Sequence, residues 1–400
     1  MKAILTAEQR EYASTLRALL KAETPVSLVR ALNEPGADRS TPTLWKALAD
    51  AGVFGLAVAE ECGGSGGSLD DLAVFHLEAG RALCPTTVHS TVYAALAIDQ
   101  LATRDAKSAW LPPLATGSIR GTTALWSARD AAVVSPVLRA DRVSTGWRLN
   151  GTVDYVADAD VADILVVSAT TRADTPVFLV DAHAAGLTME PLDMAGGHRA
   201  CAVRFDGVVV GAEALLGNHD SGVDPSALRR VANAAVALGS LDLVGVGQAV
   251  IDRTVEYTKL RHQFGRPIAS FQAAQHLIAN MHIALAAARL AAHSAVFWIA
   301  RRHTATRETA IARMHAAKAA RLITLDAHQL HGGMGYVTET DLHLWSERAR
   351  WGSTVGGGAD VAAVWLEETM DDQKTMDDQK TMDDQRTMDD QRTMDEDEPR

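Results

Sequence analysis

The chain has 400 residues and a mass of 42.6 kDa, which is too much for one compact core and predicts two or three domains. Its 47% hydrophobic and 22% charged residues are typical of a folded protein, not of a disordered chain. The formal net charge of −12 is concentrated in residues 367–400, which hold 14 acidic and 5 basic residues, whereas residues 1–366 hold 36 and 33. This near-neutral body excludes the basic surface that nucleic-acid binding requires.

Cysteine usage and hydropathy narrow the class of protein further. Three cysteines, Cys62, Cys84 and Cys201, are odd in number and widely spaced, which argues against a disulfide framework and a cysteine-based metal site. The N-terminus becomes charged within a few residues and lacks the apolar stretch of a signal peptide. No uninterrupted apolar run approaches the roughly 18 residues of a membrane span. We expect a soluble cytoplasmic protein that binds no metal and no membrane.

The pattern of apolar residues changes twice along the chain. Residues 1–118 show helical spacing, with Leu16, Leu19 and Leu20 on one face. Residues 119–222 instead carry short β-branched runs at 132–134, 147–149, 164–168, 177–180, 202–205 and 208–210. Glycine, aspartate and asparagine separate these runs, as in an antiparallel β-domain. Helical spacing returns over 223–368. The prediction is an α+β protein with helical, sheet and helical domains in that order.

Residues 369–400 form a tail of hexapeptide repeats. TMDDQK begins at Thr369 and Thr375, and TMDDQR at Thr381 and Thr387. A period of six gives no continuous apolar face, and methionine is the only apolar residue. Such a segment buries too little surface to offset the entropy of ordering, so we expect an acidic, disordered tail.

Five segments, in order along the chain, carry a family resemblance: WKALADAGVFGLAVAEECGGSGGS (45–68), GWRLNGTVDYVADADVADILVVSA (146–169), GGHRACAVRFDGVVVGAEALLG (196–217), RHQFGRPIASFQAAQHLIANM (261–281) and HQLHGGMGYVTETDLHLWSERAR (328–350). Together they resemble the acyl-CoA dehydrogenases. The resemblance implies an N-terminal helical domain, a middle β-domain and a C-terminal four-helix bundle. It also implies FAD, an acyl-CoA substrate and a catalytic glutamate that removes the α-proton while the β-hydrogen leaves as hydride.

The sequence departs from this family where the catalytic base belongs. The position of the usual glutamate falls on Gly356, and the alternative position on an earlier helix falls near Ala235. Neither residue can accept a proton, so we expect no catalytic residue in this chain. Asp242 and Asp360 lie near these positions and remain candidates for a substitute base.

The flavin-ring contacts of the family are also missing. The stretch that corresponds to its T-E-P-x-x-G-S-D loop reads ALWSARDAAVVSP, residues 124–136. Its W-I-T-N motif corresponds to residues 155–158, where Tyr155 keeps an aromatic ring and Ala157 lacks the hydroxyl. The resemblance therefore implies a lost ring pocket.

By contrast, the residues that hold the adenosine and pyrophosphate end of a neighbouring subunit's FAD are kept. By resemblance, these cofactor-binding residues are Arg261, Phe264, Gln272, Gln329, Gly332 and Gly333. Their chemistry suits the role, because a guanidinium pairs with phosphate and glycines let backbone amides approach it. A purely structural role also accounts for them, since glycines end helices and Arg261 could pair with an acid.

This asymmetry resembles the non-catalytic subunit of heterotetrameric actinobacterial steroid side-chain acyl-CoA dehydrogenases. The implied assembly is an α2β2 complex in which a homologous catalytic subunit binds most of the acyl-CoA, FAD lies at the interface and an electron-transfer flavoprotein accepts the electrons. Two alternatives stay open: a self-sufficient homo-oligomeric dehydrogenase with an unusual base, and a non-redox scaffold or regulatory protein whose tail is the interaction element.

Overall fold

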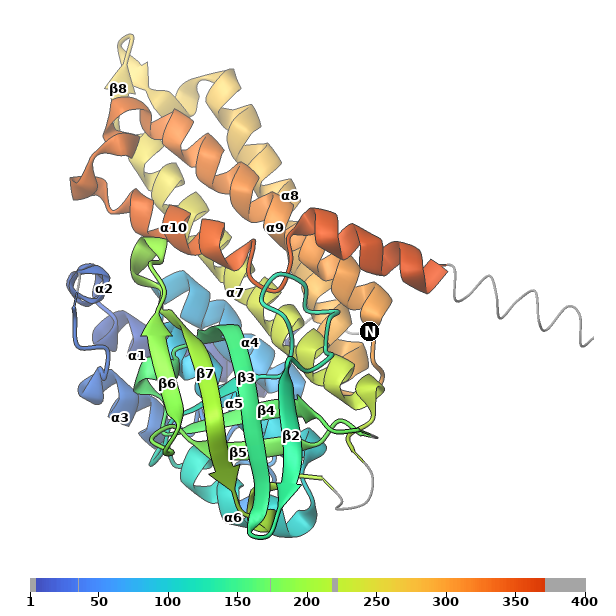
Figure 1. Cartoon of the computed structure of the whole chain (residues 1–400). Helices are drawn as coiled ribbons and strands as arrows, with labels where there is room; N and C mark the ends of the chain where they lie inside the picture. Colours follow the sequence, from blue (N-terminus) through green and yellow to red (C-terminus); the bar gives the residue numbers. More distant parts are fainter. Residues whose placement is uncertain (1–4, 35, 173, 218–221, 371–400) are drawn as a thin grey trace, which may run out of the picture.

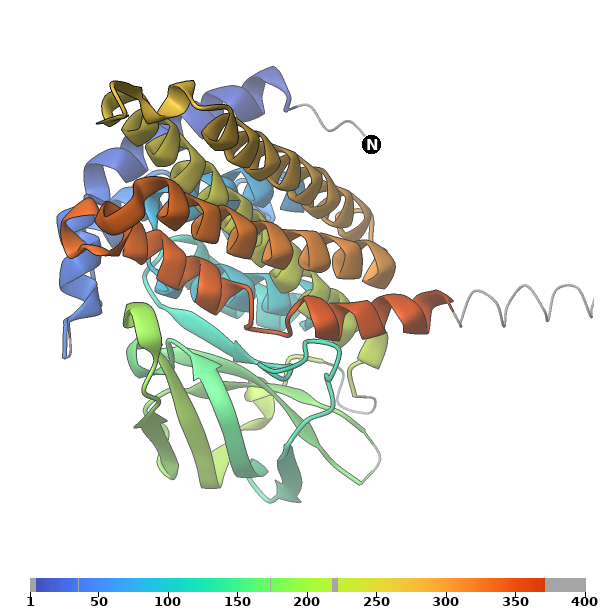
Figure 2. The same ribbon diagram turned by 90° about the horizontal axis from the view of Figure 1, so that it is seen from above.

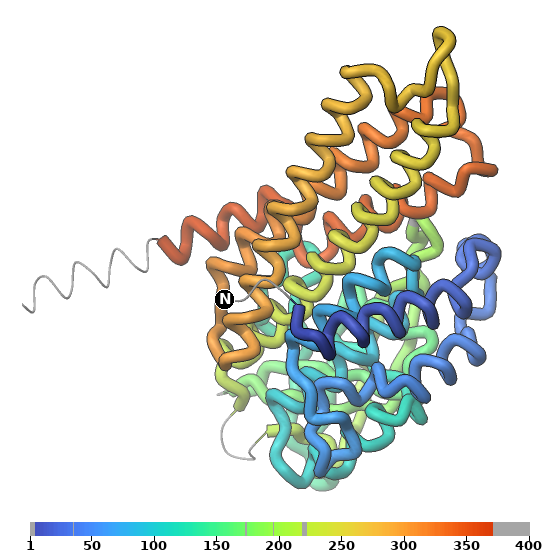
Figure 3. Tube along the Cα trace, turned by 180° about the vertical axis from the view of Figure 1, so that it is seen from behind, coloured from blue at the N-terminus to red at the C-terminus, as the bar shows by residue number. Residues whose placement is uncertain are grey.

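The computed structural model describes residues 5–34, 36–172, 174–217 and 222–370. The N-terminal part is helical, and a Thr6–Gln9 capping box opens its first helix. Its elements are α1 (Ala7–Glu23), α2 (Val26–Asn33), α3 (Pro42–Asp50), the 3₁₀ turn η1 (Glu60–Cys62), α4 (Leu69–Ala82), α5 (Thr86–Leu101) and α6 (Arg104–Ala115). Figure 3 shows α1 lying along the outside of this layer.

The middle part is a seven-stranded sheet, which lies below the C-terminal helices in Figure 1. Its strands are β1 (Gly121–Ala124), β2 (Leu138–Val143), β3 (Gly146–Ala157), β4 (Ile164–Thr170), β5 (Val177–Asp181), β6 (Leu187–Pro191) and β7 (Ala200–Val210). The strand order is β1-β4-β2-β3-β7-β6, with β5 paired to β4. The short 3₁₀ turns η2 (Ala159–Val161), η3 (Ala195–Gly197) and η4 (Ala212–Ala214) connect strands or follow the last of them.

The sheet is mixed and not purely antiparallel. Four pairings are antiparallel, but β4 runs parallel to both β1 and β2. A parallel pair needs a long crossover, and the chain between β1 and β4 supplies it. Hydrophobic spacing reports which face of a strand is buried, but it does not report strand direction.

Three of the predicted strand runs need correction. Residues 132–134 lie in a loop, where Val133 is exposed and its carbonyl accepts a bond from Ser127 N–H. The runs at 202–205 and 208–210 belong to one strand, β7. Gly207, with φ +69°, lies at a register shift between β3 and β7, so a bulge interrupts the apolar pattern without ending the strand.

The C-terminal part is a bundle of α7 (Pro225–Leu260), α8 (Gln272–Ile299), α9 (Thr306–His331) and α10 (Leu342–Gly352), followed by a helix over 359–370. A hairpin of β8 (His262–Gln263) and β9 (Arg266–Pro267), which the sequence analysis missed, and the turn η5 (Ile268–Ser270) join α7 to α8. The turns η6 (Gly332–Tyr336) and η7 (Thr338–Thr340) join α9 to α10. Figure 2 shows the bundle lying over the sheet. Thr369 and Met370 of the predicted tail lie in the last helix, and 371–400 lie outside the described residues.

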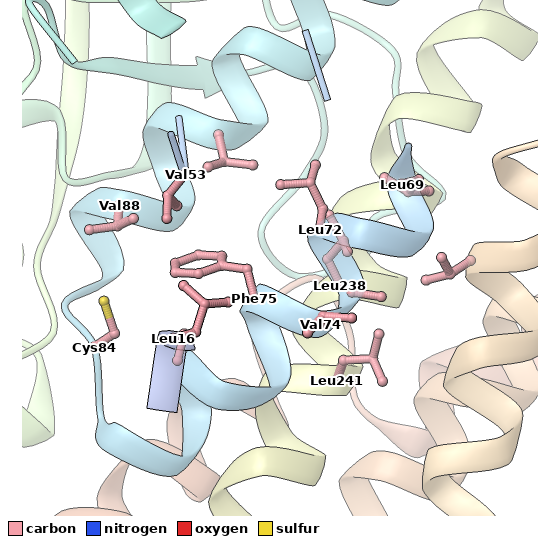
Figure 4. Close-up of a cluster of buried hydrophobic side chains, with 14 of the residues drawn as sticks. Leu16, Val53, Leu69, Leu72, Val74, Phe75, Cys84, Val88, Leu238 and Leu241 are labelled. Atoms are coloured by element: carbon pink, nitrogen blue, oxygen red, sulfur yellow. The ribbon is translucent and has the colours of Figure 1, made fainter. Parts of the chain in front are cut away.

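The long helix α7 connects the two helical parts through one core. Phe75 of α4 lies among Leu16 of α1, Val88 of α5 and Leu238 of α7 (Figure 4). Glycine permits the close approach of α4 and α7, because a Cβ at Gly245 would overlap the carbonyl oxygen of Leu77. α7 therefore packs closely against α4 within this core.

Two helices, α7 and α8, are long and apolar enough to span a bilayer by length and composition alone. The apolar segment of α7 is 83% buried in the protein, which identifies it as a core helix. The corresponding segment of α8 is only 33% buried, so much of its apolar surface faces outward. Part of the apolar surface of α8 is therefore left uncovered by the described chain.

Candidate functional site

The two positions at which the family places its catalytic glutamate lie at one cavity in this chain. Gly356, after α10, and Ala235, in α7, both line a cavity of about 120 Å³, together with Tyr155 and Ala157 of β3. The lining of this cavity therefore combines residues that are far apart in the sequence, from α5, α7, β3 and the turn after α10. The only acidic side chain among the lining residues is Asp242.

Backbone conformation at Gly356 disfavours a larger residue, although a Cβ alone would make only ordinary contacts. Its φ is +76°, in the left-handed region that disfavours side chains. A Cβ at this position would lie 3.5 Å from Ala131 Cβ and 3.7 Å from Val236 Cγ2. The amide of Gly356 donates to the carbonyl of Ala128 at 2.6 Å, and its carbonyl accepts from Ala131 N–H at 2.9 Å. The loop over 124–136 is therefore bonded directly to the turn where a catalytic base would stand.

Arg313 of α9 fixes the same turn from the other side. Its buried guanidinium donates hydrogen bonds to the carbonyls of Gly352 and Val355 at 2.6 Å and of Gly357 at 2.7 Å. These carbonyls lie at the C-terminal end of α10, where a cation is favoured. Burial lowers the pKa of Arg313 to about 10, so the side chain stays charged near neutral pH.

The loop over 124–136 packs against the protein and is not a free surface loop. Trp365 Nε1 donates to Asp130 Oδ1 at 2.8 Å. Ala131, Val236 and Trp365 belong to one buried apolar cluster. This packing places the loop over 124–136 against α7 and the helix over 359–370.

Asp242, one of the candidate substitute bases, forms a buried ion pair. Both of its oxygens accept from Arg348 at 2.9 Å, and His89 Nε2 lies 3.2 Å from Oδ1. Burial alone would raise the pKa of the Asp242 carboxyl, but the Arg348 guanidinium and His89 outweigh it and hold the pKa well below its ordinary value. A carboxylate stabilised in this way is a poor proton acceptor.

Asp360, the other candidate, is exposed in the helix over 359–370 and does not line the cavity. Tyr155 does line it, and its hydroxyl accepts a hydrogen bond from Trp351 Nε1 at 3.1 Å. Trp351 also stacks on His198, with ring centroids 4.2 Å apart. The aromatic ring at 155 is thus held by the bundle.

The six residues assigned to a neighbour's FAD lie elsewhere, at one end of the bundle. α8 runs antiparallel to α7 and α9, so the end of α7, the start of α8 and the end of α9 come together. Arg261, Phe264, Gln272, Gln329, Gly332 and Gly333 are all exposed there, and none lines the cavity. Figure 1 shows the hairpin beside β8 at the end of the molecule farthest from the sheet.

Contacts within the chain leave most of these six residues unexplained. Phe264 is 93% exposed at φ +50°, and the Arg261 side chain forms no hydrogen bond or ion pair among the described residues. Gly332 has φ +58°, which suits the end of α9. Gly333 has no positive φ, and a Cβ there would meet nothing within 4 Å. Neither backbone conformation nor packing requires a glycine at 333.

Sequence reasoning missed the charged network of His89, Arg313 and Arg348 around the cavity. One signal was present: Asp242 is a lone charge in the apolar stretch 231–251. A buried carboxylate needs a cationic partner, although the sequence does not say which of the arginines supplies it.

Models of the acyl-CoA dehydrogenase N-terminal and C-terminal domains match residues 6–118 and 227–369. The chain belongs to the acyl-CoA dehydrogenase family, whose enzymes are oxidoreductases that act on a CH–CH bond. Acyl-CoA dehydrogenase IpdE2 of Mycolicibacterium smegmatis is 30% identical, covering 86% of this chain and 92% of that protein. IpdE2 of Mycobacterium tuberculosis is 33% identical, covering 82% and 89%.

Solved structures share the same fold. A Tcur3481–Tcur3483 steroid ACAD variant is 29% identical with a TM-score of 0.82, covering 92% of this chain and 99% of that chain. A glutaryl-CoA dehydrogenase from Mycobacterium smegmatis, solved with FADH2, has a TM-score of 0.80 at 20% identity and covers 92% and 95%. The expected family and its helical–sheet–helical architecture are thus confirmed, and FAD is confirmed as the cofactor of the family.

Proposed function

We propose that this chain is the non-catalytic subunit of a heteromeric, FAD-dependent acyl-CoA dehydrogenase. The observation that carries the proposal is a separation in space. The residues that the resemblance assigns to a neighbour's FAD are exposed at one end of the bundle, whereas Gly356 and Ala235, at the positions it assigns to the base, line a separate cavity. The chain would therefore contribute residues to a partner's FAD site and would not catalyse the reaction at a site of its own.

The chain's own cavity does not fit a flavin. Its lining keeps an aromatic ring at Tyr155 but has alanine at 157 and glycine at 356, so it lacks the hydroxyl and the base that the family resemblance assigns to these positions. The exposed end of the bundle does fit a share of one. Arg261 would pair with the pyrophosphate. The open surface at Gly333 would let the pyrophosphate approach the backbone amides. FAD bound there would supply the hydride acceptor. The partner would supply the catalytic glutamate and the pocket for the flavin ring.

Exposed apolar surface supports an obligate partner. Ile283 and Leu290 of α8 and Leu322 and Leu325 of α9 are exposed on two helices that pack side by side. Isolated exposed apolar residues are ordinary, but a set on adjacent helices marks an interface. A homologous catalytic subunit seated on this face would form the α2β2 complex.

For the substrate, we propose a bulky acyl-CoA, such as one with a steroid side chain, bound mainly by the partner. The support is the likeness to IpdE2 and to the Tcur3481–Tcur3483 steroid ACAD. An electron-transfer flavoprotein would take up the electrons. The cytoplasm is the proposed compartment.

Co-expression tests this proposal. The chain is purified alone and together with a homologous acyl-CoA dehydrogenase encoded beside it, and flavin absorbance and assembly mass are measured for both. We expect flavin only in the mixed complex, with one FAD for every two chains. One FAD per chain in the lone protein would contradict the proposal.

The self-sufficient alternative relies on Asp242 or Asp360, and the Arg348 ion pair and the exposed position of Asp360 count against both. If it held, Asp242→Ala or Asp360→Ala would abolish dehydrogenase activity in the lone protein. The scaffold alternative relies on the tail, and a chain without residues 369–400 that kept every partner would remove its support.

A further inference from the structure

The cavity beside Gly356 has the walls of a small ligand site. Four aromatic side chains line it: Tyr93, Trp126, Tyr155 and Trp351. Its volume of about 120 Å³ is close to the ~150 Å³ at which an apolar cavity holds benzene. The space therefore suits one six-membered ring.

Charge around this cavity is unbalanced. Arg348 is neutralised by Asp242, but Arg313 forms no ion pair among the described residues. The three carbonyls that it contacts orient its guanidinium without neutralising it. Two buried cations thus face one buried anion, and an uncompensated buried charge is costly. An anion in the cavity would remove this cost.

Hydrogen-bond donors also face the cavity without acceptors. The Tyr93 hydroxyl, the Thr123 hydroxyl and Trp126 Nε1 have no hydrogen-bond partner in the described chain, although all three residues line the cavity. The Tyr155 hydroxyl accepts from Trp351 but donates to nothing there. A ligand with oxygen acceptors would satisfy these groups.

We infer that this cavity binds a compact, flat organic monoanion, a single-ring carboxylate of the size of benzoate. The aromatic residues contact the ring, and the tyrosine hydroxyls and the excess positive charge bind the carboxylate. The site takes neither flavin nor thioester, and it does not depend on a partner chain. It goes beyond the proposed function by giving the non-catalytic chain a ligand of its own.

Isothermal titration calorimetry of the full-length chain with benzoate tests this inference. We expect saturable binding at one site per chain. Benzyl alcohol, which keeps the ring but lacks the charge, should bind at least about tenfold more weakly, because hydrogen bonds to charged groups are the stronger ones. Tyr93→Phe, which removes only a hydroxyl, should weaken benzoate binding by about tenfold.

Gly239 of α7 offers a variant that fills the cavity without disturbing the core. A Cβ there would have only the Tyr93 hydroxyl near it, at 4.0 Å. Gly239→Leu should abolish benzoate binding, while Gly239→Ala should raise the melting temperature by favouring the helix and confirm that the position tolerates substitution. Absence of binding to the unmodified chain, equal binding of benzyl alcohol, or full binding by a folded Gly239→Leu protein would each overturn the inference.

Discussion

At Gly356 a single residue decides whether a base can be restored. The left-handed φ opposes any Cβ, and Arg313 holds the surrounding turn. The backbone at Gly356 therefore disfavours a side chain at the position to which the family resemblance assigns a glutamate.

We predict that Gly356→Glu will not produce dehydrogenase activity in the lone chain and will destabilise it. A non-glycine residue in this conformation costs roughly 1–3 kcal/mol, to which partial burial of a carboxylate adds. Urea unfolding measures the loss, with the exposed Asp360→Glu as a control that should change nothing. A stable, active Gly356→Glu protein would show that the turn adapts.

The Asp242–Arg348 pair makes a second prediction at this scale. Removing only the carboxylate leaves a buried cation, so Asp242→Ala should destabilise the protein by about 3–5 kcal/mol, whereas the double variant Asp242→Leu with Arg348→Met should recover most of this loss. Urea unfolding of both variants and of wild type measures the difference. A double variant as unstable as Asp242→Ala would contradict this account of the pair.

The same pair sets a dependence on pH. Because the folded pKa of Asp242 lies below its ordinary value, the pair's contribution is present above the unfolded pKa of about 3.9 and is lost as pH falls toward the folded pKa. The unfolding midpoint of wild type should therefore fall more steeply below about pH 4 than that of the double variant.

At the scale of elements, the exposed end of the bundle combines the hairpin after α7, the start of α8 and the turn after α9. The six assigned residues are exposed and make few contacts within the described chain. Substitutions there should therefore affect cofactor binding more than the stability of the fold. This separation allows a test of the assigned cofactor residues.

We predict that Gly333→Ala and Arg261→Ala will leave the melting temperature of the lone chain unchanged, because a Cβ at 333 would meet nothing within 4 Å and the exposed Arg261 side chain has no hydrogen bond or ion pair in the described chain. Both should reduce the FAD content of the mixed complex, with Arg261→Ala the more severe since it removes a phosphate partner. Flavin absorbance per complex gives the readout. Normal FAD content in both variants would refute the assignment.

At the scale of the whole molecule, the apolar face of α8 and α9 predicts how subunits meet. Ile283→Glu should place an unpaired charge in the interface and shift the complex toward separate chains, as measured by light scattering. Val137→Glu, at an equally exposed apolar residue after the sheet's first loop, is the matched control and should assemble normally. Intact complexes with Ile283→Glu would place the interface on another face.

The sequence by itself determined the family, the order of the helical and sheet parts, and the positions at which the chain matches or departs from the family's motifs. Those features depend on letters in a fixed order, such as R-x-x-F-G at 261–265, and on the local spacing of apolar residues. Strand direction and the single strand β7 were beyond this reasoning, because a bulge at Gly207 breaks the spacing without breaking the strand.

Only the tertiary structure decided that Gly356, Ala235 and Asp242 line one cavity. It also decided that Asp242 forms its ion pair with Arg348. These residues come from different helices and turns, and Asp242 and Arg348 are 106 positions apart. Their meeting depends on the close packing of α7 against α4 and α10, which is set by the fit of side chains across elements and not by local sequence. The charge left on Arg313 emerges from the same packing, because only the fold shows which buried cations have an anion beside them.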